Sequence, residues 1–215
     1  MSLEYDPDEA TAFLAQADRQ LARVIKRAGP FSMRPERMQS PFVALFRAIV
    51  YQQLSGKAAG TIYARVQQQV PGKLTPQAVL DVDDEVLRGA GMSRAKVAAV
   101  KDLAGRTLDG TVPTLARLRK LSDDEIVERL SSVRGVGVWT VEMLLIFRLG
   151  RPDVLPVSDL GVRKGFMATY RKSELPTRTE LLEHGQRWRP YRSVASWYMW
   201  RATEQPPAKP RASKA

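Results

Sequence analysis

Helix-start signals recur along this chain and constrain its fold more than any other feature. Ser40 and Thr75 are each followed directly by a proline, and a capping residue before a proline at the first helical position is typical of a helix start. Ser122 and Glu125 have the spacing of a capping box, in which each side chain bonds the other residue's backbone N–H. Apolar residues between these signals recur at intervals of three and four, whereas alternating strand patterns are scarce. The pattern predicts an all-α fold.

The individual helices can be placed from these signals. The segment from Pro41 to Val70 is expected to break near Ser55–Gly56 into two helices, and another helix is expected after a cap at Ser93. Beyond a proline-containing link at 151–156, further helices are predicted at about 160–169, 178–187 and 192–203.

This link divides the chain into two predicted lobes. We predict a two-lobed helical bundle in which residues 37–150 form one lobe, and residues 1–36 and 151–205 form the second. Residues 206–215 are basic and proline-rich and lack large apolar side chains, so they are predicted to be a disordered tail.

Two glycines lie between the helix that Ser122 caps and a strongly apolar helix that begins near Val138. Glycine allows unusual backbone angles and close approach of another backbone, while a helix N-terminus presents unpaired N–H groups with partial positive charge. Together with the charge of Arg134, the residues Gly135, Gly137 and Thr140 therefore form a candidate phosphate-binding turn. The alternative is a tight corner between two helices in which the glycines only avoid strain.

The net charge of +11 and the sequence pI near 10.2 favour a polyanionic partner, most simply nucleic acid. A solvated basic surface without a partner is the alternative. The chain contains no cysteine, which excludes disulfides, thiolate metal sites and cysteine-ligated clusters. Because no long uncharged apolar stretch and no signal-like N-terminus occur, a cytoplasmic location is expected, with association to the nucleoid when DNA is bound.

A helix, a glycine turn, a second helix and an aspartate about twenty residues further on form an informative combination. The segment LSSVRGVGVWTVEMLLIFRLGRPDVLPVSDLGVRKGF resembles the helix–hairpin–helix DNA glycosylases, in particular the alkylated-base branch typified by DNA-3-methyladenine glycosylase II. The resemblance extends to FRAIVYQQLSGKAAGTI, GMSRAKVAAVKDLA and RWRPYRSVASWYMWR. Only about forty residues precede Pro41, so a compact form without the N-terminal sheet domain of larger members is expected.

The resemblance implies that Asp159 is the catalytic carboxylate, although its position before a helix is by itself that of an N-cap. Cleavage of an N-glycosidic bond builds positive charge at C1′, which a nearby anion stabilises. The carboxylate could instead orient or deprotonate the attacking water, and the sequence does not separate these roles.

Trp139 occupies the position at which the glycosylase/lyase branches have a lysine that forms a Schiff base. The resemblance therefore implies a monofunctional enzyme that leaves the strand intact. It also places Trp139, Met143 and Trp200 in the base pocket, where indole faces attract a cationic purine, although ordinary core packing is the alternative for each tryptophan. Met143 departs from the aromatic residue that the family often has at this position.

The turn YQQLSGK corresponds to the family's intercalating loop, whose wedge fills the hole left by a flipped nucleotide. Gln53 aligns with the wedge and Leu54 is the better apolar plug, while a simple helix-breaking turn is the alternative. The resemblance also implies a Na⁺ or K⁺ ion held by the backbone carbonyls of Ser131, Val133 and Val136. No cofactor is expected to be required.

These features predict a monofunctional DNA glycosylase that hydrolyses alkylated purines such as 3-methyladenine and 7-methylguanine from double-stranded DNA in base excision repair. The protein is expected to act as a monomer. The one histidine, His184, lies outside the matching motifs and is predicted to be an exposed helix-end residue, since a cationic base leaves without prior protonation. The alternatives are a non-catalytic helix–hairpin–helix DNA-binding module and a glycosylase for oxidised or mismatched bases.

Overall fold

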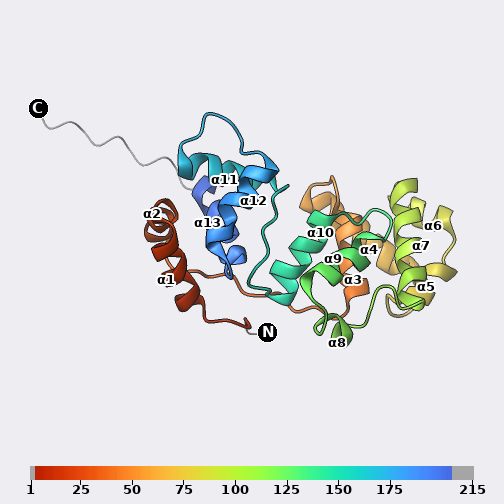
Figure 1. The fold of residues 1–215 in the computed structure, drawn as a ribbon. Coiled ribbons are helices and arrows are strands. Elements are labelled where there is room, and N and C mark those ends of the chain that lie inside the picture. The colour runs from red at the N-terminus through yellow and green to blue at the C-terminus, as the bar shows by residue number, and fades with distance from the viewer. Residues whose placement is uncertain (1–2, 205–215) are drawn as a thin grey trace, which may run out of the picture. The chain divides into compact units, whose positions relative to one another are not determined.

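The structure, a computed structural model, describes residues 3–204, and within this range it is helical without strands (Figure 1). The all-α prediction is confirmed. The helices are Pro7–Ala17 (α1), Arg19–Ala28 (α2), Pro41–Tyr51 (α3), Gly56–Gln69 (α4), Pro76–Asp81 (α5), Asp84–Gly89 (α6), Arg94–Leu108 (α7), Leu115–Leu118 (α8), Asp123–Ser131 (α9), Val138–Leu144 (α10), Leu160–Tyr170 (α11), Arg178–His184 (α12) and Arg192–Glu204 (α13). Within residues 3–204, no helix has the length and apolar character needed to cross a membrane.

The predicted caps account for where several helices begin. The Ser40 hydroxyl accepts a hydrogen bond from the N–H of Val43, and Ser55 caps α4 after the break that ends α3. Ser122 and Glu125 form the complete capping box at the start of α9. The side chain of each cap satisfies an amide that the helix itself leaves without a partner, so the boundaries follow directly from the sequence.

Two compact units make up the chain. Of the described residues, the first contains 3–35 and 150–204, and the second contains 36–149. The predicted lobes had their boundaries one residue further along the chain at both places. The predicted tail at 206–215 lies outside the described residues.

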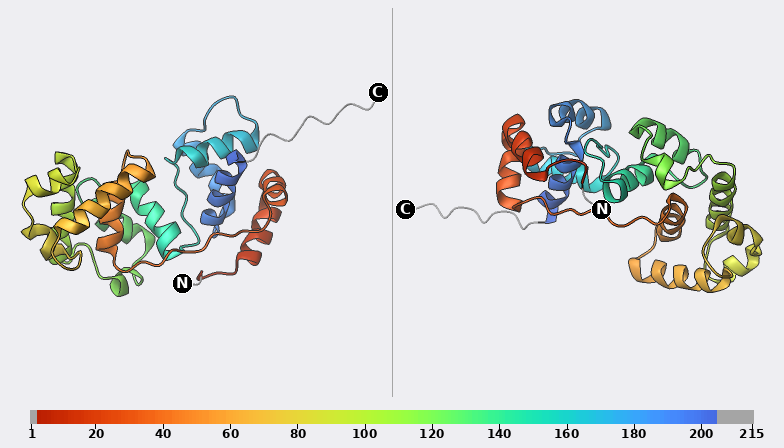
Figure 2. Two further views of the ribbon diagram at one scale, coloured as in Figure 1. Left: turned by 180° about the vertical axis from the view of Figure 1, so that it is seen from behind. Right: turned by 90° about the horizontal axis from the view of Figure 1, so that it is seen from below.

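The second unit contains helices α3 to α10, which Figure 2 shows from two further directions. In its final part, α10 passes directly into a π-helical turn at Leu145–Leu149. The short helices α6 and α8 had not been predicted, because a helix of four to six residues is too short for its apolar period to be read.

In the first unit, α11 and α13 lie side by side (Figures 1 and 2), and their backbones approach closely at Gly165. Gly165 of α11 is buried, and a Cβ added to it would lie 2.0 Å from the carbonyl oxygen of Met199 in α13. Any side chain at this position would force the two helices apart, because no flexible group stands in the way and only backbone could move.

A buried carboxylate joins the N-terminal helices to the rest of this unit. Asp18 Oδ1 caps α2 by accepting the N–H of Leu21 at 3.1 Å, while Oδ2 accepts the Tyr170 hydroxyl at 2.5 Å and the Trp188 indole N–H at 3.0 Å. His184 Nε2 lies 3.0 Å from the same oxygen. The prediction that His184 is an exposed helix-end residue is therefore wrong: its ring is largely buried because it bonds a buried carboxylate from a distant part of the chain.

Replacing Asp18 with alanine is expected to lower the free energy of unfolding by about 3 kcal/mol or more, because an N-cap is lost and buried donors are left without an acceptor. The matched control is Asp6→Ala. Asp6 also caps a helix, accepting the N–H groups of Asp8 and Glu9, but it is exposed. Asp6→Ala is expected to lower the free energy of unfolding by about 1 kcal/mol, and urea denaturation measures both variants. Equal losses for the two variants would contradict the structural role given to Asp18.

The stabilisation by Asp18 is expected to depend on pH. Burial raises the pKa of this carboxyl, but hydrogen bonds from His184, Tyr170, the Leu21 amide and Trp188 outweigh burial and hold the pKa below its usual range. A lowered pKa in the folded state gives stabilisation that is complete above the unfolded pKa of about 3.9 and is lost below it. The stability difference between the unmutated protein and Asp18→Ala should therefore narrow below about pH 4, and a constant difference down to pH 3 would contradict this.

Candidate active site

The turn between α9 and α10 contains two glycines with different structural roles. Gly135 has a φ of +78°, and a Cβ there would lie 3.1 Å from the Cβ of Ala99. Gly137, the N-cap of α10, has a φ of −89°, and a Cβ added to it would have no atom beyond its chain neighbours within 4 Å. The fold thus requires glycine at position 135, whereas the space beside Gly137 is open to another molecule.

Two side chains from outside the turn hold its backbone in place. Asp102 of α7 accepts the backbone N–H of Arg134 at 2.8 Å and also pairs with Arg106 at 3.1 Å. The amide of Gln52 donates to the carbonyl of Gly135 at 2.8 Å. The side chain of Arg134 is exposed, and no side chain caps α10, so the start of this helix keeps the partial positive charge of its N–H groups.

The turn after α3 is held from a third helix. Lys96 of α7 donates through Nζ to the carbonyls of Val50 at 2.7 Å and Gln52 at 2.8 Å, at the end of α3 where carbonyls lack helical partners. Gln53 then has a φ of +57°, and the following Leu54 is 41% exposed. Lys96 therefore anchors the base of a turn whose tip presents both predicted wedge residues.

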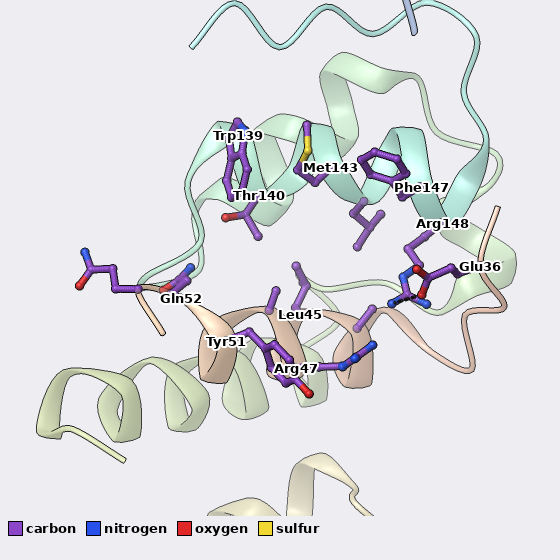
Figure 3. A pocket seen from close by; sticks show the side chains of 14 residues that line it. Glu36, Leu45, Arg47, Tyr51, Gln52, Trp139, Thr140, Met143, Phe147 and Arg148 are labelled. Atoms are coloured by element: carbon purple, nitrogen blue, oxygen red, sulfur yellow. Dashed lines mark ion pairs between the residues drawn. The ribbon is translucent and has the colours of Figure 1, made fainter. Parts of the chain in front are cut away.

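A cavity of about 580 Å³ lies between α3 and α10 (Figure 3). Trp139, Met143 and Phe147 line one wall, four residues apart along α10 and the π-helical turn, and Figure 3 shows them in a row. Leu45 and Tyr51 of α3 contribute to the opposite wall. The full lining consists of Glu36, Ala44, Leu45, Arg47, Ala48, Tyr51, Gln52, Gln53, Trp139, Thr140, Met143, Leu144, Phe147 and Arg148.

The two cationic side chains of this cavity have electron-rich partners. Arg148 pairs with Glu36 at 2.8 Å, shown by a dashed line in Figure 3. The guanidinium of Arg47 lies 4.7 Å from the centre of the Tyr51 ring. These contacts offset part of the positive charge around a cavity whose other lining side chains are aromatic, aliphatic and thioether groups together with the polar Gln52, Gln53 and Thr140.

Asp159 belongs to the other unit, where it is the N-cap of α11. Its Oδ1 accepts the N–H of Val162 at 2.7 Å and the indole N–H of Trp200 at 2.8 Å. The capping role inferred from the sequence is present, and the carboxylate receives a second donor from α13. Two N–H donors that converge on one oxygen fix the orientation of this carboxylate.

The structure groups the predicted site residues in two sets. Trp139, Met143, Thr140 and Gln53 line the cavity of the second unit, with Thr140 buried there although it was predicted to bind phosphate. Trp200 bonds Asp159 in the first unit. Sequence reasoning missed Lys96 and Phe147, and only the position of Phe147, four residues after Met143, could have indicated it.

The predicted cation site lies on the same turn. The Val133 carbonyl accepts the N–H of Val136 at 3.0 Å and, like any carbonyl oxygen, has a second lone pair. In the described part of the chain, no backbone amide from outside a helix donates to the carbonyls of Ser131 or Val136. Three such oxygens suit a hard cation, so the residues fit the predicted Na⁺ or K⁺ ion, which stays a prediction.

Comparison with known proteins identifies a family and several relatives to which this chain is similar. The family described as HhH-GPD superfamily base excision DNA repair protein matches residues 46–190. DNA-3-methyladenine glycosylase 1 of Schizosaccharomyces pombe is 37% identical over 204 residues, which cover 91% of this chain and 87% of the relative. The alkylbase DNA glycosidase-like protein mag2 of the same organism is 30% identical, with coverage of 93% and 95%.

Solved structures give the same result. A 3-methyladenine DNA glycosylase of S. pombe in complex with abasic DNA superposes with a TM-score of 0.78 at 36% identity, covering 92% of this chain and 97% of that one. A DNA-3-methyladenine glycosidase from Bacillus halodurans has a TM-score of 0.81 at 37% identity, with coverage of 94% and 91%.

The two glycines of the turn are expected to respond differently to substitution. Gly135→Ala should lower the free energy of unfolding by about 1–2 kcal/mol, because a side chain is disfavoured at positive φ and would press on Ala99. Gly137→Ala should change it by no more than about 0.5 kcal/mol, since its backbone angle suits any residue. Thermal denaturation of both variants measures this, and a large loss for Gly137→Ala would show that the fold, and not a ligand, needs glycine there.

Proposed function

This chain belongs to the HhH-GPD superfamily of base excision DNA repair proteins, and we propose that it is a monofunctional DNA glycosylase for alkylated purines. The substrates we propose are cationic purines such as 3-methyladenine and 7-methylguanine in double-stranded DNA. The products are the free base and an abasic site in an intact strand.

The observation that carries the proposal is the Asp159 carboxylate, held at the start of α11 by two N–H donors. As the N-glycosidic bond breaks, positive charge develops at C1′ of the deoxyribose, and a fixed carboxylate beside it lowers the barrier electrostatically. A module that only binds DNA has no need of an anion next to a polyanionic ligand, so this carboxylate argues for chemistry.

The cavity of the second unit supports a base pocket. Its volume lies within the range of small-molecule sites, and its Trp139 side chain is 45% exposed, so an indole face is accessible to a ligand. A cationic purine stacked on Trp139 gains cation–π attraction that a normal, neutral base does not. Met143 is flexible and polarizable, so this wall can adjust to alkyl groups at different ring positions.

DNA would be bound without reading its sequence. The exposed Arg134 and the uncapped N–H groups beside Gly137 suit a phosphate. The turn anchored by Lys96 presents Gln53 and Leu54, one of which would enter the duplex to replace a flipped nucleotide. The net charge of +11 favours this association and makes it dependent on salt.

Asp159→Asn is expected to lower the single-turnover rate of base release by at least about 1000-fold, because the negative charge at C1′ is lost while the shape is kept. Asparagine retains a carbonyl oxygen that can cap α11, so the fold should be preserved. The measurement is quenched single-turnover excision from a duplex containing one 7-methylguanine.

The matched control is Asp153→Asn, which changes a carboxylate in the segment that leads to α11. Asp153 pairs with Arg189 and Arg192 at 2.8 and 2.6 Å, so the control perturbs local packing without changing Asp159. Its loss in rate should be much smaller than that of Asp159→Asn. Retention of most activity by Asp159→Asn would exclude the catalytic role.

No strand cleavage is expected from the unmutated protein. Lyase chemistry needs an amine whose lone pair attacks C1′, whereas the indole N–H of Trp139 is a donor only. None of the described side chains that line the cavity belongs to a lysine. After base release the strand should break only on alkali treatment, and borohydride should trap no protein–DNA adduct. A trapped adduct would identify an active lysine and overturn the monofunctional assignment.

A further inference from the structure

Two glycines lie one turn apart on the face of α11 that meets α13. Gly165 allows the backbones to touch at Met199, as described above. At Gly161, an added Cβ would lie 2.7 Å from Cδ1 and 3.0 Å from Nε1 of Trp200, and 3.1 Å from Oδ1 of Asp159. The first glycine therefore sets the helix spacing, and the second leaves space for the edge of one particular indole.

Backbone conformation does not explain glycine at position 161. Gly161 lies in the first turn of α11 and its φ is not in the left-handed region, so an alanine would meet no backbone strain there. The three atoms nearest to an added Cβ belong to the five-membered ring of Trp200 and to the carboxylate to which that ring donates. Because an aromatic ring is rigid and α13 is held at Gly165, the indole cannot yield without moving its N–H away from Asp159.

We propose that Gly161 and Trp200 are positioning residues for the Asp159 carboxylate. The Val162 N–H is local to α11 and fixes the carboxylate at the helix start, whereas the Trp200 N–H comes from α13 and fixes its direction. Trp200 thus acts on the reaction through Asp159, in addition to any contact with the base. Gly161 acts through Trp200, because it leaves the indole the space from which it donates.

This inference rests on the catalytic role proposed for Asp159. Gly161→Ala changes no charge and removes no functional group, yet it should slow single-turnover base release by about 10-fold to 100-fold through loss of one charge-assisted hydrogen bond. Binding to a duplex with an abasic-site analogue should stay within about 2-fold, since the DNA-contacting groups are unchanged. Gly105→Ala is the control: Gly105 lies inside α7 with nothing within 4 Å of an added Cβ, and the variant should keep the full rate.

A double-mutant cycle separates positioning from simple damage to the fold. Trp200→Ala removes the donor and both ring atoms, Cδ1 and Nε1, that an alanine at 161 would strike. In that background Gly161→Ala should cost less than about 2-fold, so the two effects should not multiply. If they multiply, Gly161 does not act through Trp200 and the inference is wrong.

A spectroscopic readout tests the hydrogen bond without using activity. The chain has four tryptophans, and the indole N–H resonance of Trp200 is the one that Trp200→Phe removes from the ¹H–¹⁵N spectrum. That resonance should shift in both Gly161→Ala and Asp159→Asn and stay in place in Gly105→Ala. An unshifted resonance in Gly161→Ala would overturn the inference.

The two proposals fail in distinguishable ways. If Asp159→Asn keeps base release, the catalytic assignment fails, while the spectrum still reports whether Gly161 sets the indole contact. If Asp159→Asn abolishes release but Gly161→Ala and Trp200→Phe both keep it within about 2-fold, the catalytic assignment stands and the positioning inference falls.

Discussion

The contact between the backbones of α11 and α13 is the constraint on which the candidate catalytic residue depends. Gly165 permits this contact, and it brings Trp200 to the start of α11, where the indole N–H reaches Asp159 Oδ1 at 2.8 Å. A wider helix spacing would take the indole donor of Trp200 away from this carboxylate, whereas the capping bond from Val162 is local to α11. An N-cap aspartate is common in proteins, and the close packing of two helices is what gives this one a second donor and a fixed direction.

In the other unit, polar side chains, and not a contact between two helices, hold the candidate binding turns in position. Asp102 and Gln52 hold the glycine turn through backbone atoms, and Lys96 holds the turn after α3 in the same way. Each bond uses a side chain from a distant part of the sequence to satisfy a backbone group of a turn or helix end. These hydrogen bonds fix the backbone of both surface turns, while the exposed sides of the turns stay available to a ligand.

Most of the fold was predictable because the residues that determine where a helix begins lie close together in the sequence. Ser40, Ser55 and Ser122 begin helices through bonds to amides three residues away, and such pairs are visible in a sequence. The bonds that position the site span long sequence separations: Lys96 reaches the end of α3, and Trp200 reaches Asp159 from 41 residues away. His184 illustrates the same limit, since the partner that buries it, Asp18, is 166 residues away. Local pattern carries no information about such contacts, so these roles emerge only from the folded chain.

The most direct test of the account is whether the unmutated protein releases a free base. A duplex with a single 7-methylguanine or 3-methyladenine would be incubated with excess protein, and the small-molecule fraction analysed by mass spectrometry. We predict that the free alkylated purine appears in equal amount with alkali-labile sites in an otherwise intact strand. Tight binding of the same duplex with no released base would contradict it and would identify a DNA-binding module without glycosylase chemistry.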